Sequence, residues 1–245
     1  MNIETLSVPA STTRVQRLMR RFYTQRRIDP LDALFCDLAK PGMTVLDAGC
    51  GGDRGCSRDA PWEQMYIVGV DCTPDVGRNP FCNEKAVTDL AKLPFQDATF
   101  DLIHCRWVLE HLPDPLAVFR EFARVLRPGG QFVALTPNFY HYATLGAWLT
   151  PHWFHRWWWG AEFDPFPTVY RANTRRTIRR LCRRAGLSLV NVKMIEGPPG
   201  YLTRNWLAFL FGVLYERTVN LGACTAGLRQ RIVLRAMNAR VGHDD

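Results

Sequence analysis

The sequence predicts an α/β fold in which a mostly parallel sheet is covered by helices on both faces. Two observations lead to this fold class. First, short apolar runs typical of buried strands alternate with helical runs along most of the chain, as expected for parallel strands joined by crossover helices. Second, a chain of 245 residues with 47% hydrophobic and 22% charged residues suits one globular domain with a complete hydrophobic core.

The individual elements follow from local patterns. Residues 14–22 place Val15, Leu18, Met19 and Phe22 at helical spacing, with arginines on the opposite side. Further helices are expected over 31–39, 115–126, 174–184 and 203–218. Strands are expected over 43–49, 66–71, 100–105, 131–138, 187–195 and 231–237, with a further strand ending near Asp89.

The organisation of the chain is that of a single domain over 1–245, since no repeat or low-complexity linker interrupts it. The helix over 115–126 is expected to stop at the sequence RPGG, because proline and glycine both end helices. The domain divides into a core over 31–138, an aromatic-rich insertion over about 139–172 after the fifth strand, and a C-terminal helix and strands over 173–240.

A glycine-rich turn, LDAGCGGD, follows the first strand. Gly49 and Gly51 let the backbone turn tightly and bring its amides against a ligand. Arg54 stands where the dinucleotide fingerprint G-x-G-x-x-G requires a third glycine. Asp71 ends the second strand, where a carboxylate can accept hydrogen bonds from ribose hydroxyls, and Asp89 follows the third strand, within reach of an adenine amino group. This set favours a cofactor with ribose and adenine but no pyrophosphate.

The motifs VLDAGCG, VGVD, DLAKLPFQDATFDLIHCRWVLEHLPDP and EFARVLRPGGQFVALTPN resemble, as an ordered set, those of the class I S-adenosylmethionine-dependent methyltransferases. The similarity covers about residues 40–138 and points to the type-11, quinone-biosynthesis-like branch of small-molecule enzymes. It implies a seven-stranded Rossmann-like sheet with an antiparallel last strand, and S-adenosyl-L-methionine as cofactor. One departure is Asp53, which stands where the family often has a third glycine.

The resemblance also implies which residues surround the cofactor. These are Asp47, Gly49, Cys50 and Gly51 around the methionine part, Asp71 with its neighbour Cys72 at the ribose, Asp89 and Leu90 at the adenine, and Cys105 with the residues after it at the mouth where the methyl group is transferred.

The candidate catalytic residue is a histidine. Methyl transfer from a sulfonium is an in-line displacement, so the enzyme aligns the acceptor and excludes water, and a base is needed only if the acceptor loses a proton. His111, in WVLEHLPDP, could be that base or could brace its loop. His141, His152 and His155 are rival candidates. No metal is expected, since the eight cysteines show no zinc-like spacing.

The insertion carries many aromatic side chains, including the triplet Trp157, Trp158 and Trp159. Ligands of open α/β sheets bind at the carboxyl ends of the strands, so an insertion at that edge is expected to wall a bulky acceptor or to dip into a bilayer. Extra core packing is the alternative. The net charge of +8 is concentrated in residues 14–27 and 171–184. Arginines beside rings are typical of contact with an anionic membrane surface, although RNA-binding proteins share them.

The sequence therefore predicts a cytoplasmic methyltransferase that acts on a small or lipid-linked acceptor and binds peripherally to a membrane. One alternative is an RNA or protein methyltransferase that uses the arginine-rich faces, and another is a non-catalytic cofactor-binding relative. The early Glu4 and the lack of an apolar run near it argue against a secretory signal, and the apolar run 205–215 is too short to span a bilayer.

Overall fold

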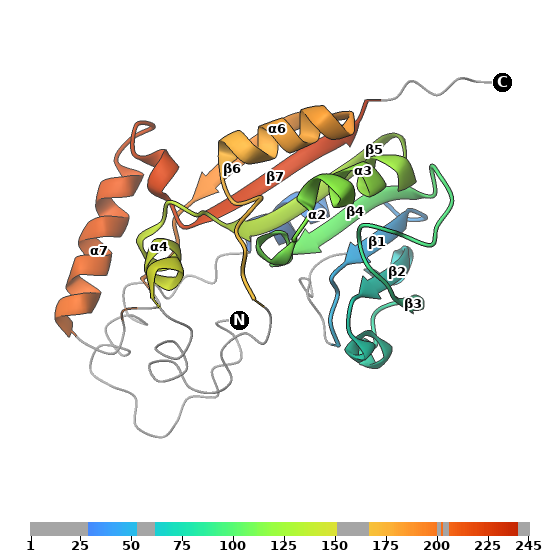
Figure 1. The fold of residues 1–245 in the computed structure, drawn as a ribbon, viewed down its shortest axis with the longest axis horizontal. Helices are drawn as coiled ribbons and strands as arrows, with labels where there is room; N and C mark the ends of the chain where they lie inside the picture. Colours follow the sequence, from blue (N-terminus) through green and yellow to red (C-terminus); the bar gives the residue numbers. More distant parts are fainter. Residues whose placement is uncertain (1–28, 53–61, 151–166, 200–201, 203–205, 240–245) are drawn as a thin grey trace.

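The computed structural model describes residues 29–52, 62–150, 167–199, 202 and 206–239. Within these ranges seven strands form one sheet in the order β3-β2-β1-β4-β5-β7-β6 (Figure 1). The strands are β1 (Thr44–Ala48), β2 (Tyr66–Asp71), β3 (Glu84–Val87), β4 (Phe100–Arg106), β5 (Leu126–Pro137), β6 (Leu187–Ile195) and β7 (Arg231–Asn238).

The pairing confirms the seven-stranded Rossmann-like sheet. Strands β1 to β5 pair in parallel, whereas β7 runs antiparallel to both β5 and β6. The carboxyl ends of β1, β2, β4 and β5 therefore meet at one edge of the sheet. In open α/β sheets this is the edge at which ligands bind.

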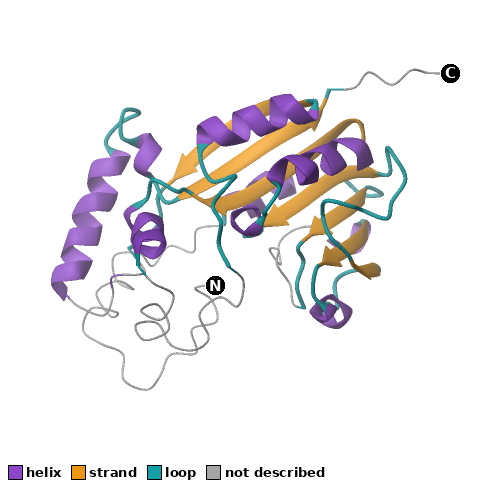
Figure 2. Cartoon of the chain, viewed as in Figure 1, coloured by secondary structure: helices purple, strands orange, loops and turns teal. Residues whose placement is uncertain are grey.

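Helices cover both faces of the sheet (Figure 2). The described helices are α2 (Pro30–Leu38), α3 (Pro115–Val125), α4 (Tyr142–Leu149), α6 (Arg175–Ala185) and α7 (Trp206–Asn220), and short 3₁₀ turns lie at Trp62–Gln64, Pro74–Arg78, Leu109–His111 and Ala226–Leu228. Helices α3 and α6 pack side by side, whereas α7 stands beside α4 beyond one end of the sheet (Figure 1).

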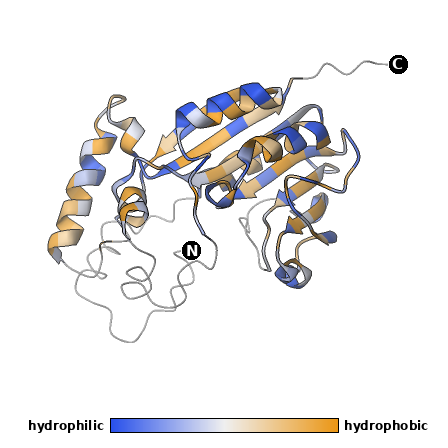
Figure 3. Ribbon diagram, viewed as in Figure 1, coloured by the Kyte–Doolittle hydropathy of each residue, from blue (hydrophilic) through white to orange (hydrophobic). Residues whose placement is uncertain are grey.

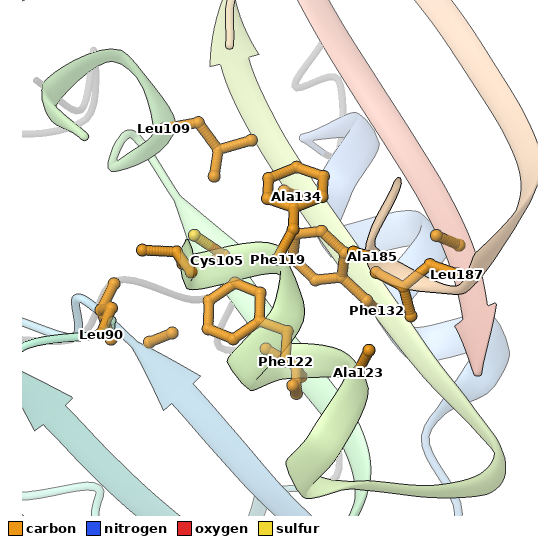
Figure 4. Packing of buried hydrophobic residues seen from close by; sticks show 14 of the residues in the cluster. Leu90, Cys105, Leu109, Phe119, Phe122, Ala123, Phe132, Ala134, Ala185 and Leu187 are labelled. Atoms are coloured by element: carbon orange, nitrogen blue, oxygen red, sulfur yellow. The ribbon is translucent and has the colours of Figure 1, made fainter. Parts of the chain in front are cut away.

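The alternation of side chains along the strands gives the sheet two buried faces. On one face Phe132 of β5 packs against Phe119 and Phe122 of α3, with ring centroids 5.4 and 4.9 Å apart (Figure 4). On the other face Phe35 of α2 stacks on Trp62 at 4.3 Å. Each fully buried phenylalanine contributes about 1.5–3 kcal/mol of transfer free energy. The core on both faces fixes the strand ends that form the site.

Two elements differ from the sequence-based expectation. Strand β5 begins at Leu126, not at 131, because RPGG stops α3 but leads directly into an extended chain that pairs with β4 through a bulge. Helix α4 was not expected within the insertion, and the His141 side chain caps it by accepting from the Ala143 N–H. The expected helix over 14–22 lies outside the described residues.

Candidate cofactor and acceptor site

The glycine-rich turn after β1 has the backbone that its sequence predicts. Gly49 and Gly51 have φ angles of +76° and +57°, a left-handed conformation that favours glycine. A β-carbon on Gly49 would lie 2.2 Å from Cγ2 of Val108, whereas one on Gly51 would have no neighbour within 4 Å. Val108 therefore requires glycine at position 49 by contact, and the space over Gly51 is a cradle that a ligand can enter.

Asp71, at the end of β2, is tied to this turn. Its Oδ2 accepts from the Gly51 N–H at 3.0 Å, and its Oδ1 accepts from the N–H and the Oγ1 of Thr73, both at 2.9 Å. A carboxylate offers about four acceptor positions, and the Cys72 thiol, a weak donor, bonds to the same carboxylate, so a ligand hydroxyl would take the place of that thiol. The carboxylate is thus oriented before any ligand binds.

Asn79 holds the same turn from the other side. Its side chain is buried, and its Nδ2 donates to the carbonyl oxygens of Cys50 and Gly51 at 3.2 and 3.3 Å. Its Oδ1 accepts from the Phe81 N–H at 3.0 Å. Asn79 therefore fixes the peptide groups that follow Cys50 and Gly51.

Asp47, at the end of β1, is paired with a buried histidine. Its Oδ1 lies 2.9 Å from Nδ1 of His104 in β4. The His104 ring is enclosed by Phe35 and Trp62, which meet it edge to face at 5.5 and 6.1 Å. The pair fixes the Asp47 carboxylate next to Gly49.

The remaining predicted cofactor residues fall in two environments. Asp89 is exposed two residues after β3, and its Oδ1 accepts from the Ala91 N–H at 2.9 Å. Leu90 is buried, and Cys72 is exposed directly after Asp71. The Cys105 thiol is fully buried beside Leu90 in the hydrophobic core (Figure 4), and this burial raises its pKa well above the usual value. Only the Cys105 backbone and the residues after it can line a cofactor mouth.

Arg106 and Trp107 follow Cys105 at the carboxyl end of β4. Arg106 pairs with Asp32 of α2 and lies 3.4 Å from Asp29. Trp107 has a φ of 55°, unusual for a bulky residue, and the Arg231 guanidinium stands 5.9 Å from its ring centroid. The Arg106 guanidinium is therefore neutralised by acidic side chains within the protein.

A buried polar network braces the connection after β4. Glu110 accepts a hydrogen bond from Oγ1 of Thr136 at 3.0 Å, and Nδ2 of Asn173 donates to the same hydroxyl at 2.7 Å. The carbonyl of Glu110 accepts from the N–H groups of Val169 and Tyr170. These contacts make Glu110 a structural residue that orders its loop.

His111 is half-buried on the 3₁₀ turn after β4. Its Nδ1 lies 3.2 Å from the carbonyl oxygen of Pro167, so Nδ1 carries the proton that this contact needs. In the neutral ring Nε2 is then the basic atom. The contact with Pro167 holds the His111 ring to its loop, and the role of His111 as a base stays a prediction.

The rival His141 is part of a buried brace at the start of α4. Its Nδ1 accepts from the Ala143 N–H at 3.3 Å, and its Nε2 lies 3.5 Å from Oε1 of Glu196. Glu196 also accepts from the Gln230 N–H, at 2.9 Å. Because His141 is almost fully buried, it acts as a structural link between α4 and the ends of β6 and β7. His152 and His155 lie outside the described residues, as do Trp157, Trp158 and Trp159.

No group of three or more His, Cys, Asp or Glu side chains in the described part of the chain could hold a metal ion. No helix among the described elements is long and apolar enough to cross a membrane.

Comparison with known proteins assigns the family. The profile of a methyltransferase domain family matches residues 16–192. The chain belongs to the class I S-adenosylmethionine-dependent methyltransferases. S-adenosylmethionine is accordingly its cofactor, and the left-handed turn, the cradle over Gly51 and the oriented Asp71 carboxylate fit that molecule.

The relatives of this methyltransferase match it over less than half of their own length. The ubiquinone biosynthesis O-methyltransferase of Xanthomonas campestris pv. campestris is 33% identical over 119 residues, which are 44% of this chain and 48% of that protein. The sterol 4-C-methyltransferase of Caenorhabditis elegans is 30% identical over 128 residues, which are 46% of this chain and 38% of that protein.

Solved structures share the fold of this methyltransferase. A methyltransferase from Methanosarcina mazei has a TM-score of 0.55 at 15% identity, over 86% of this chain and 97% of that one. Geranyl diphosphate C-methyltransferase from Streptomyces coelicolor A3(2), solved with Mg²⁺, geranyl diphosphate and S-adenosyl-L-homocysteine, has a TM-score of 0.53 at 16% identity, over 97% and 89% of the two chains. At this identity the likeness shows the fold.

Several residues of the site were not predicted from the sequence. His104 is a polar residue inside the apolar run FDLIHC, and that position could have marked it as a partner of a buried acid. Asn79 and Thr73 lie in irregular chain after β2, where no periodicity singles them out. Val108 contacts Gly49 only because β1 and β4 are neighbours in the sheet.

Proposed function

We propose that this methyltransferase transfers the methyl group of S-adenosylmethionine to a small or lipid-linked apolar acceptor at a membrane surface. The observation that carries the proposal is the apolar surface of α4 and α7, which stand at the acceptor side of the sheet edge. On α4 Trp148 and Leu149 are 60% and 70% exposed. Relatives include a ubiquinone biosynthesis O-methyltransferase and a sterol 4-C-methyltransferase, and ubiquinone and sterols are lipids. We also propose that 1–245 acts as one domain, since strands from both sides of the insertion share one sheet.

The cofactor contacts are assigned on the same basis. S-adenosylmethionine supplies an electrophilic methyl group on a sulfonium. We place its methionine part against Asp47, Gly49, Cys50 and Gly51, where backbone amides and an oriented carboxylate are available. Asp71 binds the ribose, with Cys72 beside it. Asp89 and Leu90 hold the adenine, because they follow β3 at the same sheet edge and combine an exposed carboxylate with a buried apolar side chain.

His111 is proposed as the base for an acceptor that loses a proton. The Pro167 carbonyl fixes the tautomer with the proton on Nδ1, which leaves Nε2 to take a proton. A His111→Gln variant should lower kcat by about 10²–10⁴-fold while the affinity for S-adenosylmethionine stays within twofold. A variant with full kcat would leave His111 as a brace only.

The membrane part of the proposal rests on the outer face of α7. Successive residues of an α-helix are about 100° apart, so the exposed apolar residues of α7 fall on one side of the helix: Trp206, Leu207, Leu210, Phe211 and Leu214, each 55–65% exposed. Among the exposed residues of α7, Arg217 is the only charged one. Figure 3 shows the contrast with α6, which is strongly hydrophilic, while α7 is mostly hydrophobic. Placing these side chains in the apolar part of a bilayer would remove their surface from water, which is favourable.

Aromatic contacts join this face to α4. The ring of Tyr142 meets those of Phe211 and Tyr215 at 6.0 and 4.8 Å. A membrane bound by α7 would therefore lie next to the insertion at the acceptor side. An acceptor with an apolar tail could then reach the cofactor without leaving the lipid phase.

The acceptor class is tested with S-adenosylmethionine that carries a tritiated methyl group. Enzyme and cofactor are added to a cell lysate, which is then separated into lipid, aqueous small-molecule, RNA and protein fractions. Label in the lipid fraction, or in a small apolar compound, is expected. Label confined to RNA or protein would overturn the acceptor class, and binding of the cofactor with no transfer to any fraction would favour a non-catalytic relative.

The membrane surface is tested by sedimentation with liposomes of neutral or anionic lipid. A Leu210→Asp, Leu214→Asp variant should lose binding that persists at high salt, because apolar burial is insensitive to screening. Val190→Asp, on the exposed part of β6 at 48% exposure, is the matched control and should bind as the wild type does. Wild-type protein that stays in the supernatant with both lipids would refute membrane binding and leave a water-soluble acceptor.

A further inference from the structure

Two thiols meet beneath the glycine-rich turn. Cys50 lies within the turn, between Gly49 and Gly51, and Cys82 lies just before β3. A β-carbon on Gly69 of β2 would lie 2.4 Å from Sγ of Cys82 and 2.9 Å from Sγ of Cys50. Both sulfur atoms therefore occupy the space left by one missing side chain. The thiols also form a hydrogen bond with each other.

The two thiols are chemically unequal. The hydrogen bond from Cys50 lowers the pKa of the Cys82 thiol, and the same bond together with burial raises the pKa of the Cys50 thiol. Lys85 acts in the same direction on the pKa of Cys82, while Asp47 acts against it. The side chains are only 4% and 8% exposed, so a water-sized reagent reaches them more readily than a bulky one. Burial acts against the lowering of the pKa of Cys82. Because both sulfur atoms lie beside one point next to Gly69, the Cys50 thiol is placed to react with an oxidised Cys82 sulfur.

We propose that Cys50 and Cys82 form a reversible disulfide that weakens binding of S-adenosylmethionine. With hydrogen peroxide as oxidant, the Cys82 sulfur attacks one peroxide oxygen, the O–O bond breaks, and a sulfenic acid and water result. The Cys50 sulfur then attacks the Cys82 sulfur, the S–O bond breaks and a second water leaves with the Cys50 proton. Two thiols are oxidised and one peroxide is reduced to two waters.

The link to the cofactor is the backbone of the turn. A disulfide holds its sulfurs about 2.05 Å apart, closer than any hydrogen-bonded pair, so Cys50 is drawn toward Cys82. Asn79 binds the carbonyls of Cys50 and Gly51, and Asp71 binds the Gly51 N–H. The turn cannot follow the Cys50 sulfur without disturbing these bonds, which set the amides that face the cofactor. By reciprocity of linked equilibria, bound cofactor must oppose disulfide formation.

The test uses the full chain, treated with hydrogen peroxide and then alkylated in denaturant. Peptide mapping should find a Cys50–Cys82 link, formed several-fold more slowly when S-adenosylmethionine is present. Calorimetry should show at least fivefold weaker binding of S-adenosylmethionine after oxidation, restored by dithiothreitol. Cys82→Ser should bind the cofactor without any effect of peroxide, and Cys224→Ser, at an exposed position outside the pair, should behave as wild type.

Two outcomes would overturn the proposal. The first is that peptide mapping of the oxidised, folded wild type finds no Cys50–Cys82 disulfide, or finds Cys50 linked instead to Cys56, which lies outside the described residues. The other is a complete Cys50–Cys82 link with unchanged affinity. Neither result bears on the acceptor, so failure here is separate from failure of the proposed function. Mapping of the wild type decides the matter even if Cys82→Ser does not fold.

Discussion

Replacement of Asp71 by alanine should weaken binding of S-adenosylmethionine by about 10- to 150-fold. Three of its acceptor positions are taken by Gly51 and Thr73, and the fourth meets only the weak Cys72 thiol donor, which a ribose hydroxyl would replace. A hydrogen bond to a charged group contributes about 1.5–3 kcal/mol, and each 1.4 kcal/mol is a factor of ten in Kd. Loss of the bond to Gly51 also frees the turn, so the effect should lie toward the upper end of this range.

Asn in place of Asp71 should be nearly as harmful as alanine. One amide oxygen cannot serve both Thr73 and the Gly51 N–H, and an amide NH₂ that faces the Gly51 N–H pairs donor with donor. Thr73→Val removes one hydroxyl from Oδ1 and frees an acceptor position, so its Kd should stay within threefold of the wild type. Comparison of the three variants separates the effect of losing the Asp71 carboxylate from the effect of losing the Thr73 hydroxyl that supports it.

Isothermal titration calorimetry measures these affinities, and thermal unfolding shows that each variant is folded. Asp75→Ala is the matched control, because Asp75 is an exposed acid near the same turn whose ion pair is with Arg78, at 3.4 Å. A folded Asp71→Ala protein that binds S-adenosylmethionine within twofold of the wild type would refute the ribose assignment. Equal losses for Asp71→Ala and Asp75→Ala would show a general effect of charge instead.

The other predictions concern the supports of the turn and of the adenine side. Gly49→Ala should destabilise the protein by more than about 2 kcal/mol or unfold it, because the new β-carbon would lie 2.2 Å from Val108. Gly51→Ala should lower the free energy of unfolding by only about 1–2 kcal/mol, because of the positive φ at this position, yet it should weaken cofactor binding. Urea unfolding measures the stability of both variants, and calorimetry measures their affinity for the cofactor. Asn79→Ala should raise the Kd for S-adenosylmethionine about tenfold, with protection of the Cys50 and Gly51 amides lost in hydrogen exchange, whereas a drop in stability with unchanged Kd would assign it a structural role alone. Glu121→Gln should lower the free energy of unfolding by about 0.5–1 kcal/mol at pH 7. The hydrogen bond from Arg124 lowers the pKa of Glu121, so its contribution is present above the unfolded pKa of about 4.3 and fades as pH falls through the lower folded value; a difference from wild type that is constant from pH 7 to pH 2 would contradict this.

The parallel sheet and the cofactor edge could be predicted because local signals coincide with the strand ends. The apolar run before Gly49 and the one before Asp71 both end where the structure ends β1 and β2. Parallel pairing then brings the two ends together. The requirement for glycine at 49 and 51 follows from backbone conformation, which the sequence GCG indicates directly.

Long-range partners could not be predicted in the same way. Asn79 lies 28 and 29 residues from the carbonyls that it binds, in chain without periodicity. The burial of the Cys105 thiol depends on which face of β4 meets α3, and a run that is apolar on both faces does not reveal its orientation. Helix α4 depends on a cap supplied by His141, a residue type whose sequence signal is weak at that position.

Buried polar contacts hold the part of the sheet edge that carries α4 and α7, whereas backbone geometry holds the glycine-rich turn on the cofactor side. His141 joins α4 to Glu196 after β6, and Asn138 after β5 donates to the carbonyls of Gly227 and Arg229 at 2.7 and 2.8 Å. The two hydrogen bonds of Asn138 specify one arrangement more sharply than apolar packing does. Helices α4 and α7 are therefore fixed at their bases, close to the sheet, while their outer side chains remain exposed. Substitutions on those outer faces can change what the enzyme binds without moving Asp71 or the glycine turn, because none of the described bonds of that turn reaches α4 or α7.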